Sequence, residues 1–276
     1  MTSIKKRIKK LSAYDHFLVF LIILTLLKIG NGFITKGATE GLQFAGLGVG
    51  LIIISTGLHF LFRALFDKKK KYLHSLISTF LIILMLSHAD PEPVRGVLVI
   101  LLLYVSKFFI KYKKQTIFNP VVFTIGAITI LASFVPFLNT PPMDFTGIDI
   151  RFPIAGMQIP LPIVPILLAL TINVARLKKH PLALSFIITS IIIGFFTDAF
   201  STDVFSFLII TLFIGAAVIV EPKTSPFKQK EQIIYGVLMA VFIAILSALE
   251  IPNPIIIGLF IANIVYFVYT KIKFKK

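Results

Sequence analysis

The sequence has no cysteine and no tryptophan, and it has few charged residues. Without cysteine, the chain cannot form a disulfide, a thiolate metal site, a cysteine-ligated iron–sulfur cluster or a catalytic thiol. Without tryptophan, an aromatic belt at a membrane surface must consist of tyrosine. Charged residues make up 14% of the chain, about half of their usual share in soluble domains.

Apolar residues dominate instead. They account for 57% of the 276 residues, and the mean hydropathy is +0.95. The longest polar segment, 139–158, is too short for a large soluble domain. This composition predicts an all-α polytopic membrane protein surrounded by lipid. We expect it to be multi-pass in the inner (cytoplasmic) membrane.

Ten apolar stretches have the length of membrane-spanning or shorter buried helices. They are 17–33, 41–66, 73–87, 94–110, 120–136, 159–174, 181–196, a run ending at residue 221, 232–249 and a run opening at residue 254. Ten spans place both termini on the same side of the membrane.

The basic residues agree with that topology. If the N-terminus is cytoplasmic, all of the 28 Lys and Arg residues except Lys28, Lys36, Arg95 and Arg151 lie in or beside cytoplasmic segments. The net charge of +16 therefore reflects membrane topology, and we expect no nucleic-acid partner. We expect Lys28 to extend from its helix end towards the membrane surface.

Two kinds of residue–proline pair that bound an apolar run occur twice in the sequence. Asp90-Pro91 and Glu221-Pro222 each end an apolar run, and Asn119-Pro120 and Asn253-Pro254 each open one. Asn is a favoured N-cap and Pro suits the first helical turn. The two members of each pair lie about half a chain apart.

The spacing of these breaks divides the chain into two five-helix repeats, 1–138 and 159–276, separated by an outer loop, 139–158. Five is an odd number of spans, so the second repeat is expected to be inverted relative to the first. Interrupted helices in inverted repeats meet near the repeat interface, where membrane proteins bind ligands or ions.

Four stretches of the sequence carry a resemblance to a known family. They are 176–190 (RLKKHPLALSFIITS), 218–246 around EPKTSPFKQKEQIIYG, 258–264 (GLFIANI) and 117–120 (IFNP). Through them the chain resembles the RnfD/NqrB family, whose members are membrane proteins of the Rnf electron-transport complex and of the sodium-pumping NADH:quinone reductase. The family has Asp before the second-half proline, where this chain has Glu221.

The resemblance implies a ten-helix inverted-repeat protein that passes electrons through flavin (FMN or riboflavin) and is coupled to ion movement. Other membrane subunits of a redox complex would be its partners, with a quinone as a candidate. The polar residues expected to line a central cofactor site are Asp90, Asn119, Glu221, Lys223, Thr224, Ser225, Asn253 and Asn263. We assign bond-making chemistry to none of them, and we expect no metal site.

The outer loop departs from the family. Family members carry FMN esterified to threonine in a Ser-Gly-Ala-Thr-like motif, and the loop 139–158 has no such motif. Apart from Thr140, Thr146 is the only loosely similar residue. We therefore expect any flavin to be bound non-covalently, between the two halves.

Two other functions fit the same pattern. An inverted repeat is equally typical of a small-solute or ion transporter or channel. The missing flavin motif also fits a cofactor-free membrane scaffold for other subunits. Whether the chain is part of an enzyme depends on which of these functions it has.

Overall fold

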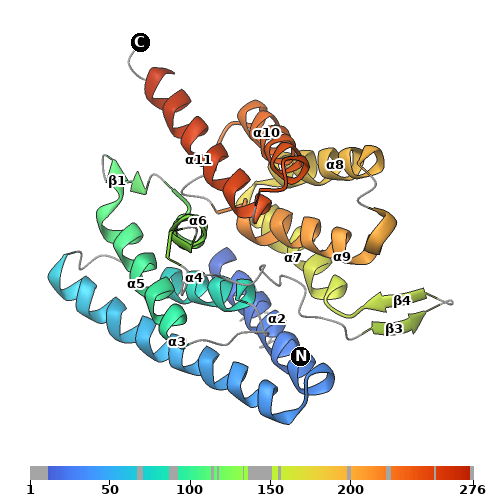
Figure 1. Cartoon of the computed structure of the whole chain (residues 1–276). Coiled ribbons are helices and arrows are strands. Elements are labelled where there is room, and N and C mark those ends of the chain that lie inside the picture. Colours follow the sequence, from blue (N-terminus) through green and yellow to red (C-terminus); the bar gives the residue numbers. More distant parts are fainter. Residues whose placement is uncertain are drawn as a thin grey trace, which may run out of the picture.

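The computed structural model describes most of the chain. The described residues are 12–66, 71–86, 93–112, 115–116, 118–132, 134–135, 151–154, 157–197, 200–221, 225–251 and 253–273. Across these ranges the protein is almost entirely helical, with ten α-helices, one π-helical turn and two short hairpins (Figure 1). The predicted helical fold is confirmed.

The helices follow the predicted order along the chain. In the first half they are α2 (Ala13–Thr35), α3 (Ala38–Leu65), α4 (Tyr72–Met85), α5 (Pro93–Phe109) and α6 (Pro120–Ala132). In the second half they are α7 (Ile163–Leu177), α8 (His180–Phe196), α9 (Phe200–Phe213), the π-helical turn η2 (Ile214–Val218), α10 (Gln229–Ala248) and α11 (Pro254–Lys273). Each lies within a few residues of a predicted apolar stretch.

Three of the described helices, α2, α3 and α10, are long and apolar enough to cross a membrane. Shorter apolar helices lie beside them in the bundle, and many large apolar side chains on the outer surface are exposed. The chain therefore has the character of a membrane protein.

Five helix contacts of the first half have a counterpart in the second half, while the contact of α4 with α6 has none among the stronger contacts. In the first half α2 packs against α3 and α4, α3 packs against α4 and α5, and α5 packs against α6. In the second half α7 packs against α8 and the α9–η2 segment, α8 packs against α9–η2 and α10, and α10 packs against α11. The first five helices meet the later ones where α2 packs on α7 and where α6 packs on α11 (Figure 1).

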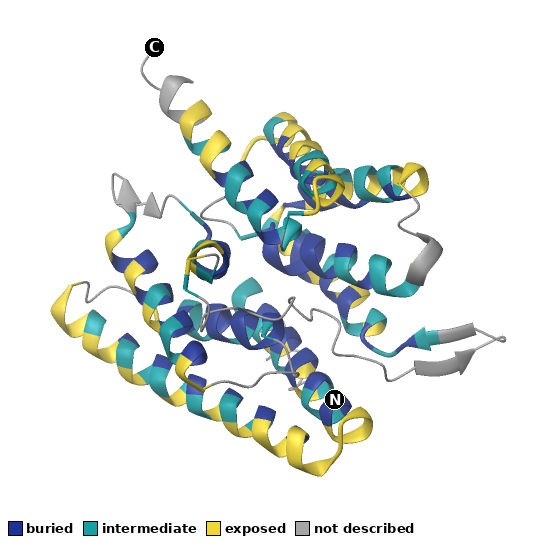
Figure 2. Cartoon of the chain, viewed as in Figure 1, coloured by how far each residue is buried: buried dark blue, intermediate teal, exposed yellow. Residues whose placement is uncertain are grey.

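Burial is concentrated at α4 and η2, which lie in the middle of the bundle (Figure 2). The outer helix α3 buries one face, including Phe44, Ser55 and His59. Its other face exposes residues such as Val49 and Ile53. This one-sided burial of a largely apolar helix is expected where lipid replaces protein on the outside.

Two short antiparallel hairpins differ from the predicted loops. β1 (Lys111–Tyr112) pairs with β2 (Gln115–Thr116), and β3 (Arg151–Ile154) pairs with β4 (Met157–Pro160). The helix expected to start at residue 159 therefore starts at Ile163 instead. Prolines 160 and 162 explain the delay, because a proline disfavours helical backbone in the residue before it.

Candidate functional site

A helix break lies at the centre of the molecule, close to the predicted position at Glu221. α9 continues into the π-helical turn η2, which ends in a turn at residues 219–220. π-helical turns occur frequently at functional sites. Gly215 lets η2 approach α8, because a Cβ at this position would lie 2.9 Å from the Ile187 side chain.

Asn119 joins this break to the first half. Its side-chain oxygen accepts hydrogen bonds from the backbone N–H groups of Val121 (2.9 Å) and Val122 (3.3 Å), so it caps α6 as predicted. Its amide nitrogen donates to the carbonyl of Val218, the last residue of η2, at 3.0 Å. Asn119 is buried, so its hydrogen bonds satisfy backbone groups that water does not reach. One side chain thus forms hydrogen bonds at the ends of two helices from different halves.

Glu221 and Ser225 shape the chain after the break. The Glu221 carbonyl accepts hydrogen bonds from the Ser225 backbone N–H (3.2 Å) and from its hydroxyl (2.7 Å). The Glu221 carboxylate is close enough to Tyr14 on α2 and Tyr235 on α10 to interact electrostatically with both. An acidic group from the second half thus lies near a phenol from the first.

Lys179 holds the same loop from the other side. Its side chain is only 2% exposed, and its ammonium group donates to the carbonyls of Ser225 (3.2 Å) and Pro226 (2.5 Å). The Phe227 ring centroid lies 4.7 Å from Lys179 Nζ, within the range of a cation–π contact. Burial lowers the pKa of Lys179 to about 8.

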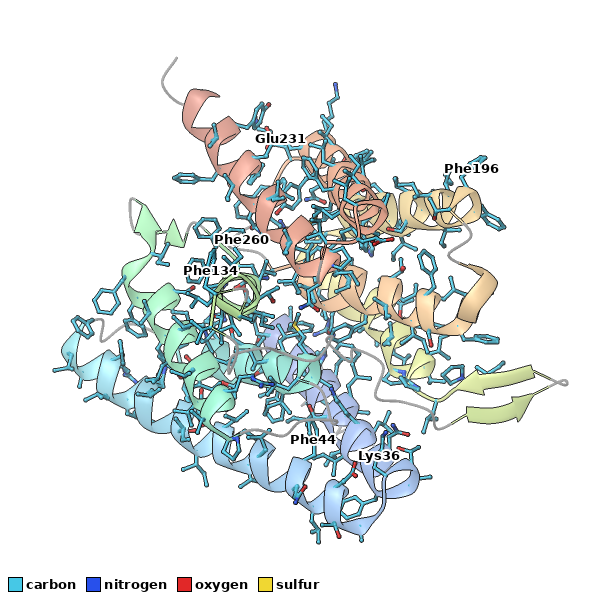
Figure 3. The ribbon with its side chains drawn as sticks, viewed as in Figure 1. Lys36, Phe44, Phe134, Phe196, Glu231 and Phe260 are labelled. Atoms are coloured by element: carbon cyan, nitrogen blue, oxygen red, sulfur yellow. The ribbon has the colours of Figure 1, made fainter. Side chains whose placement is uncertain are left out.

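Lys28 has closely similar surroundings in the first half, which corrects the expectation that it extends to the membrane surface. It is fully buried, and its ammonium group donates to the carbonyls of Leu84 (2.8 Å) and Leu86 (2.5 Å) at the end of α4. The ring centroid of Phe44, labelled in Figure 3, lies 5.3 Å from Lys28 Nζ. A cation is favourable here because the last carbonyls of a helix lack partners within it.

We call each of these groups a lysine clamp: one buried ammonium group, two backbone carbonyls and one phenylalanine ring. In each half the lysine lies near the C-terminal end of the first helix or just beyond it. The carbonyls lie at the end of α4 in the first half and in the loop between η2 and α10 in the second. Neither lysine belongs to the predicted site. Lys179 stands just before the N-terminus of α8, where a positive charge is unfavourable because the helix dipole is positive at that end. This unfavourable position could have indicated that the ammonium group interacts with another part of the chain.

The remaining predicted residues are less closely joined to this centre. Asn263 is buried, but its amide donates to Leu259 within its own helix at 2.7 Å. Asn253 has a positive φ of 52° just before α11, and its carbonyl accepts from Ile256 and Ile257. Asp90, Lys223, Thr224 and Thr146 lie outside the described residues.

The described part of the site therefore joins Asn119, Glu221 and Ser225 to residues that the sequence did not single out. Tyr14, Tyr235 and Lys179 belong to this second group. No protein-family model matches the chain, and a comparison with curated proteins finds no match.

Proposed function

We propose that this protein is an integral membrane component of an Rnf/Nqr-like electron-transport complex. In this proposal the ten helices form two inverted repeats of five, both termini are cytoplasmic, and a flavin bound non-covalently between the halves passes electrons in a process coupled to ion movement. Further membrane subunits and a quinone are the proposed partners.

The repetition of the lysine clamp carries the proposal. In each half a buried ammonium group donates to two backbone carbonyls beside a phenylalanine ring, at the end of α4 in the first half and in the loop before α10 in the second. The corresponding helix pairs support the same relation between the halves. Interrupted helices in paired positions are the feature that membrane proteins of this kind place around a ligand.

The described residues supply hydrogen-bond acceptors that fit a flavin ring. Asn119 Nδ2 and Ser225 Oγ donate to backbone carbonyls and therefore organise the site. Thr129 Oγ1 on α6 and Asn173 Oδ1 on α7 are buried and have no hydrogen-bond partner. α6 packs on α11 and α7 packs on α2, so each residue lies on a helix that contacts the other half, and an acceptor of this type suits the imide N–H of a flavin. When bound, the flavin would supply the electron-transfer chemistry.

The visible absorption of the purified full-length chain tests the proposal. We expect flavin colour that is released on denaturation and filtration, and we expect added FMN or riboflavin to rebind to chain that has lost it. Asn173→Ala should weaken that rebinding, while Thr171→Ala, at an exposed position on the same helix, should not. A folded, colourless chain that binds neither flavin would overturn the proposal.

A small-solute or ion transporter or channel is the second candidate. The observation that favours it is the Asn119–Val218 hydrogen bond, because it places the joint between the halves at an interrupted helix. Solute flux into liposomes that contain only this chain would support transport. If the chain shows neither flux nor flavin binding, the cofactor-free scaffold remains, and substitution of Glu221 should then leave assembly unaffected.

A further inference from the structure

Exposed cations gather at the place where α8 and α10 begin. The two helices pack against each other (Figure 1). Gln232 Nε2, in the first turn of α10, donates to the Lys178 carbonyl just before α8, at 3.3 Å. About one turn further along α10, a Cβ on Gly236 would lie 2.7 Å from the Leu182 carbonyl of α8. The contacts advance along both helices together, so α8 and α10 run in the same direction and start at the same end of the bundle.

Hydrogen bonds fix the two starting segments to each other. Lys179 donates to two carbonyls of the loop before α10, and Gln232 donates to a third, that of Phe227, at 3.1 Å. Residues 178–180 and 225–230 therefore form one surface whose shape is set by backbone groups. The side chains that are exposed on this surface include those of Lys178, His180, Phe227, Lys228 and Lys230.

The charge of this surface is strongly positive. The described segments 174–182 and 225–234 contain Arg176 and four lysines, and their one acidic residue is Glu231. Neither α8 nor α10 has a side-chain hydrogen bond at its N-cap, so the positive ends of two helix dipoles add to the same field. α7 ends at the same place, but the backbone N–H groups of the two residues after it donate to two of its last carbonyls. The surface therefore favours an anion.

Apolar side chains begin directly beside these cations. The exposed ones that follow at helical spacing are Ile233, Ile234 and Val237 on α10, and Leu184 and Ile188 on α8. They lie three, four or seven positions after Lys230, or four and eight positions after His180, and therefore on the same helix face as that residue. α10 is long and apolar enough to cross a membrane, which would place its first turn at the membrane surface.

We propose that this surface binds an anionic phospholipid. The headgroup phosphate lies among Lys178, Lys228 and Lys230, and the acyl chains cover the apolar faces of α8 and α10. A phospholipid carries its negative charge and its hydrocarbon in the order in which this surface presents cations and apolar side chains. An acidic protein segment or a soluble anion would match the cations alone.

The convergence of the lysines distinguishes this surface from a general excess of basic residues at one side of a membrane. Topology requires only that each loop on that side be basic. Here the bonds made by Lys179 and Gln232 bring lysines from two loops, about 50 residues apart in the chain, to one place. The proposal does not depend on flavin or on the redox function.

Native mass spectrometry of the full-length chain in detergent tests this site. We expect the chain to retain one phosphatidylglycerol molecule at concentrations at which phosphatidylcholine with the same acyl chains is lost. Lys178→Gln combined with Lys230→Gln removes one cation from each segment. It should raise the dissociation constant for phosphatidylglycerol about 25-fold, because each lysine near an anionic headgroup contributes about fivefold. If this double variant does not fold, Lys228→Gln alone should show the fivefold change.

Arg63→Gln combined with Lys71→Gln is the matched control. These two exposed cations lie at the end of α3 and just before α4, on the same expected side of the membrane but in the other half. Their removal should leave the binding of phosphatidylglycerol unchanged. Glycerol phosphate, which has the headgroup anion without acyl chains, should not displace the lipid.

Three results would overturn the proposal. An equal loss in both double variants would mean that the basic residues attract anionic lipid without a defined site. Displacement by glycerol phosphate would indicate a site for a soluble anion. Equal retention of phosphatidylglycerol and phosphatidylcholine would show that the cations do not select a lipid headgroup, and would leave them to an acidic protein partner.

Discussion

At the scale of single residues, the two buried lysines dominate the centre of the protein. An ammonium group removed from water is costly unless hydrogen bonds replace its hydration. Lys28 and Lys179 each donate hydrogen bonds to two backbone carbonyls, which replace part of that hydration. The charge of Lys28 therefore stabilises the end of α4, and the charge of Lys179 stabilises the loop that leads into α10.

Lys28→Met tests the first clamp. It removes two hydrogen bonds from a charged donor and leaves the Leu84 and Leu86 carbonyls buried beside an apolar side chain. We expect the free energy of unfolding to fall by about 2 to 4 kcal/mol. Thermal unfolding followed by circular dichroism in detergent measures the change. Lys36→Met, at the exposed end of α2, is the control and should have little effect.

Lys179 should make stability depend on alkaline pH. Its pKa in the folded protein is about 8, and the ordinary value is 10.5. Between these values the unfolded chain binds more protons than the folded chain, so the free energy of unfolding should rise with pH. Melting temperatures measured over this range should rise relative to those of Lys179→Met.

The neighbouring exposed residue supplies a control for that experiment. Lys178→Met should follow the unsubstituted protein across the pH range, because Lys178 is exposed. If the melting temperatures of the unsubstituted protein and of Lys179→Met changed in parallel with pH, the pKa of Lys179 would not be lowered in the folded protein.

At the scale of helices, close approach depends on a few glycines. α10 lies against α8 at Gly236, where an added Cβ would lie 2.7 Å from the Leu182 carbonyl oxygen and would also overlap Ser185. Gly46, on the exposed face of α3, has no neighbour within 4 Å of such an atom.

Gly236→Ala should therefore force α8 and α10 apart. We expect a loss of about 1 to 3 kcal/mol in the free energy of unfolding. Gly46→Ala makes the same chemical change without a clash, and alanine is the better helix former, so it should be neutral or stabilising. Equal melting temperatures for the two variants would contradict the observed contact between α8 and α10.

The helices themselves could be predicted from sequence because each is a long apolar run bounded by proline or polar residues. Asn119 could be predicted as a cap because an Asn-Pro pair at the start of an apolar run is a local sequence pattern. Its bond to Val218 could not, since that partner is distant in the chain. The burial of Lys28 and Lys179 was also unpredictable, because an apolar helix end with a lysine looks the same whether the side chain turns outwards or inwards. The hairpin Arg151–Pro160 was missed because the apolar residues before Pro160 suit a helix or a strand.

At the scale of the whole molecule, the two halves are joined by helix packing and by the Asn119–Val218 hydrogen bond. Asn119→Ser separates the two roles of this residue. Serine is also a good N-cap, so α6 should keep its start, but serine lacks the amide donor that reaches η2. We expect faster hydrogen exchange at η2, with little change in α6.

Hydrogen exchange measured by mass spectrometry can resolve that difference. Asn263→Ser is a suitable control, because the Asn263 amide donates to Leu259 within α11 and its loss should leave η2 unchanged. Unaltered exchange at η2 in Asn119→Ser would mean that helix packing alone holds the halves together.

The separation between Asn119 and Val218 also has a consequence for biogenesis. Lys28 can reach Leu84 once α2, α3 and α4 have been made, but the Asn119 amide must wait for 99 further residues before its acceptor exists. At a synthesis rate of about 5 to 20 residues per second, that delay is on the order of ten seconds. During this interval the first half would stand in the bilayer with one polar group directed at a surface that only the second half can cover. A membrane chaperone or insertase would therefore bind this incomplete chain rather than the finished bundle.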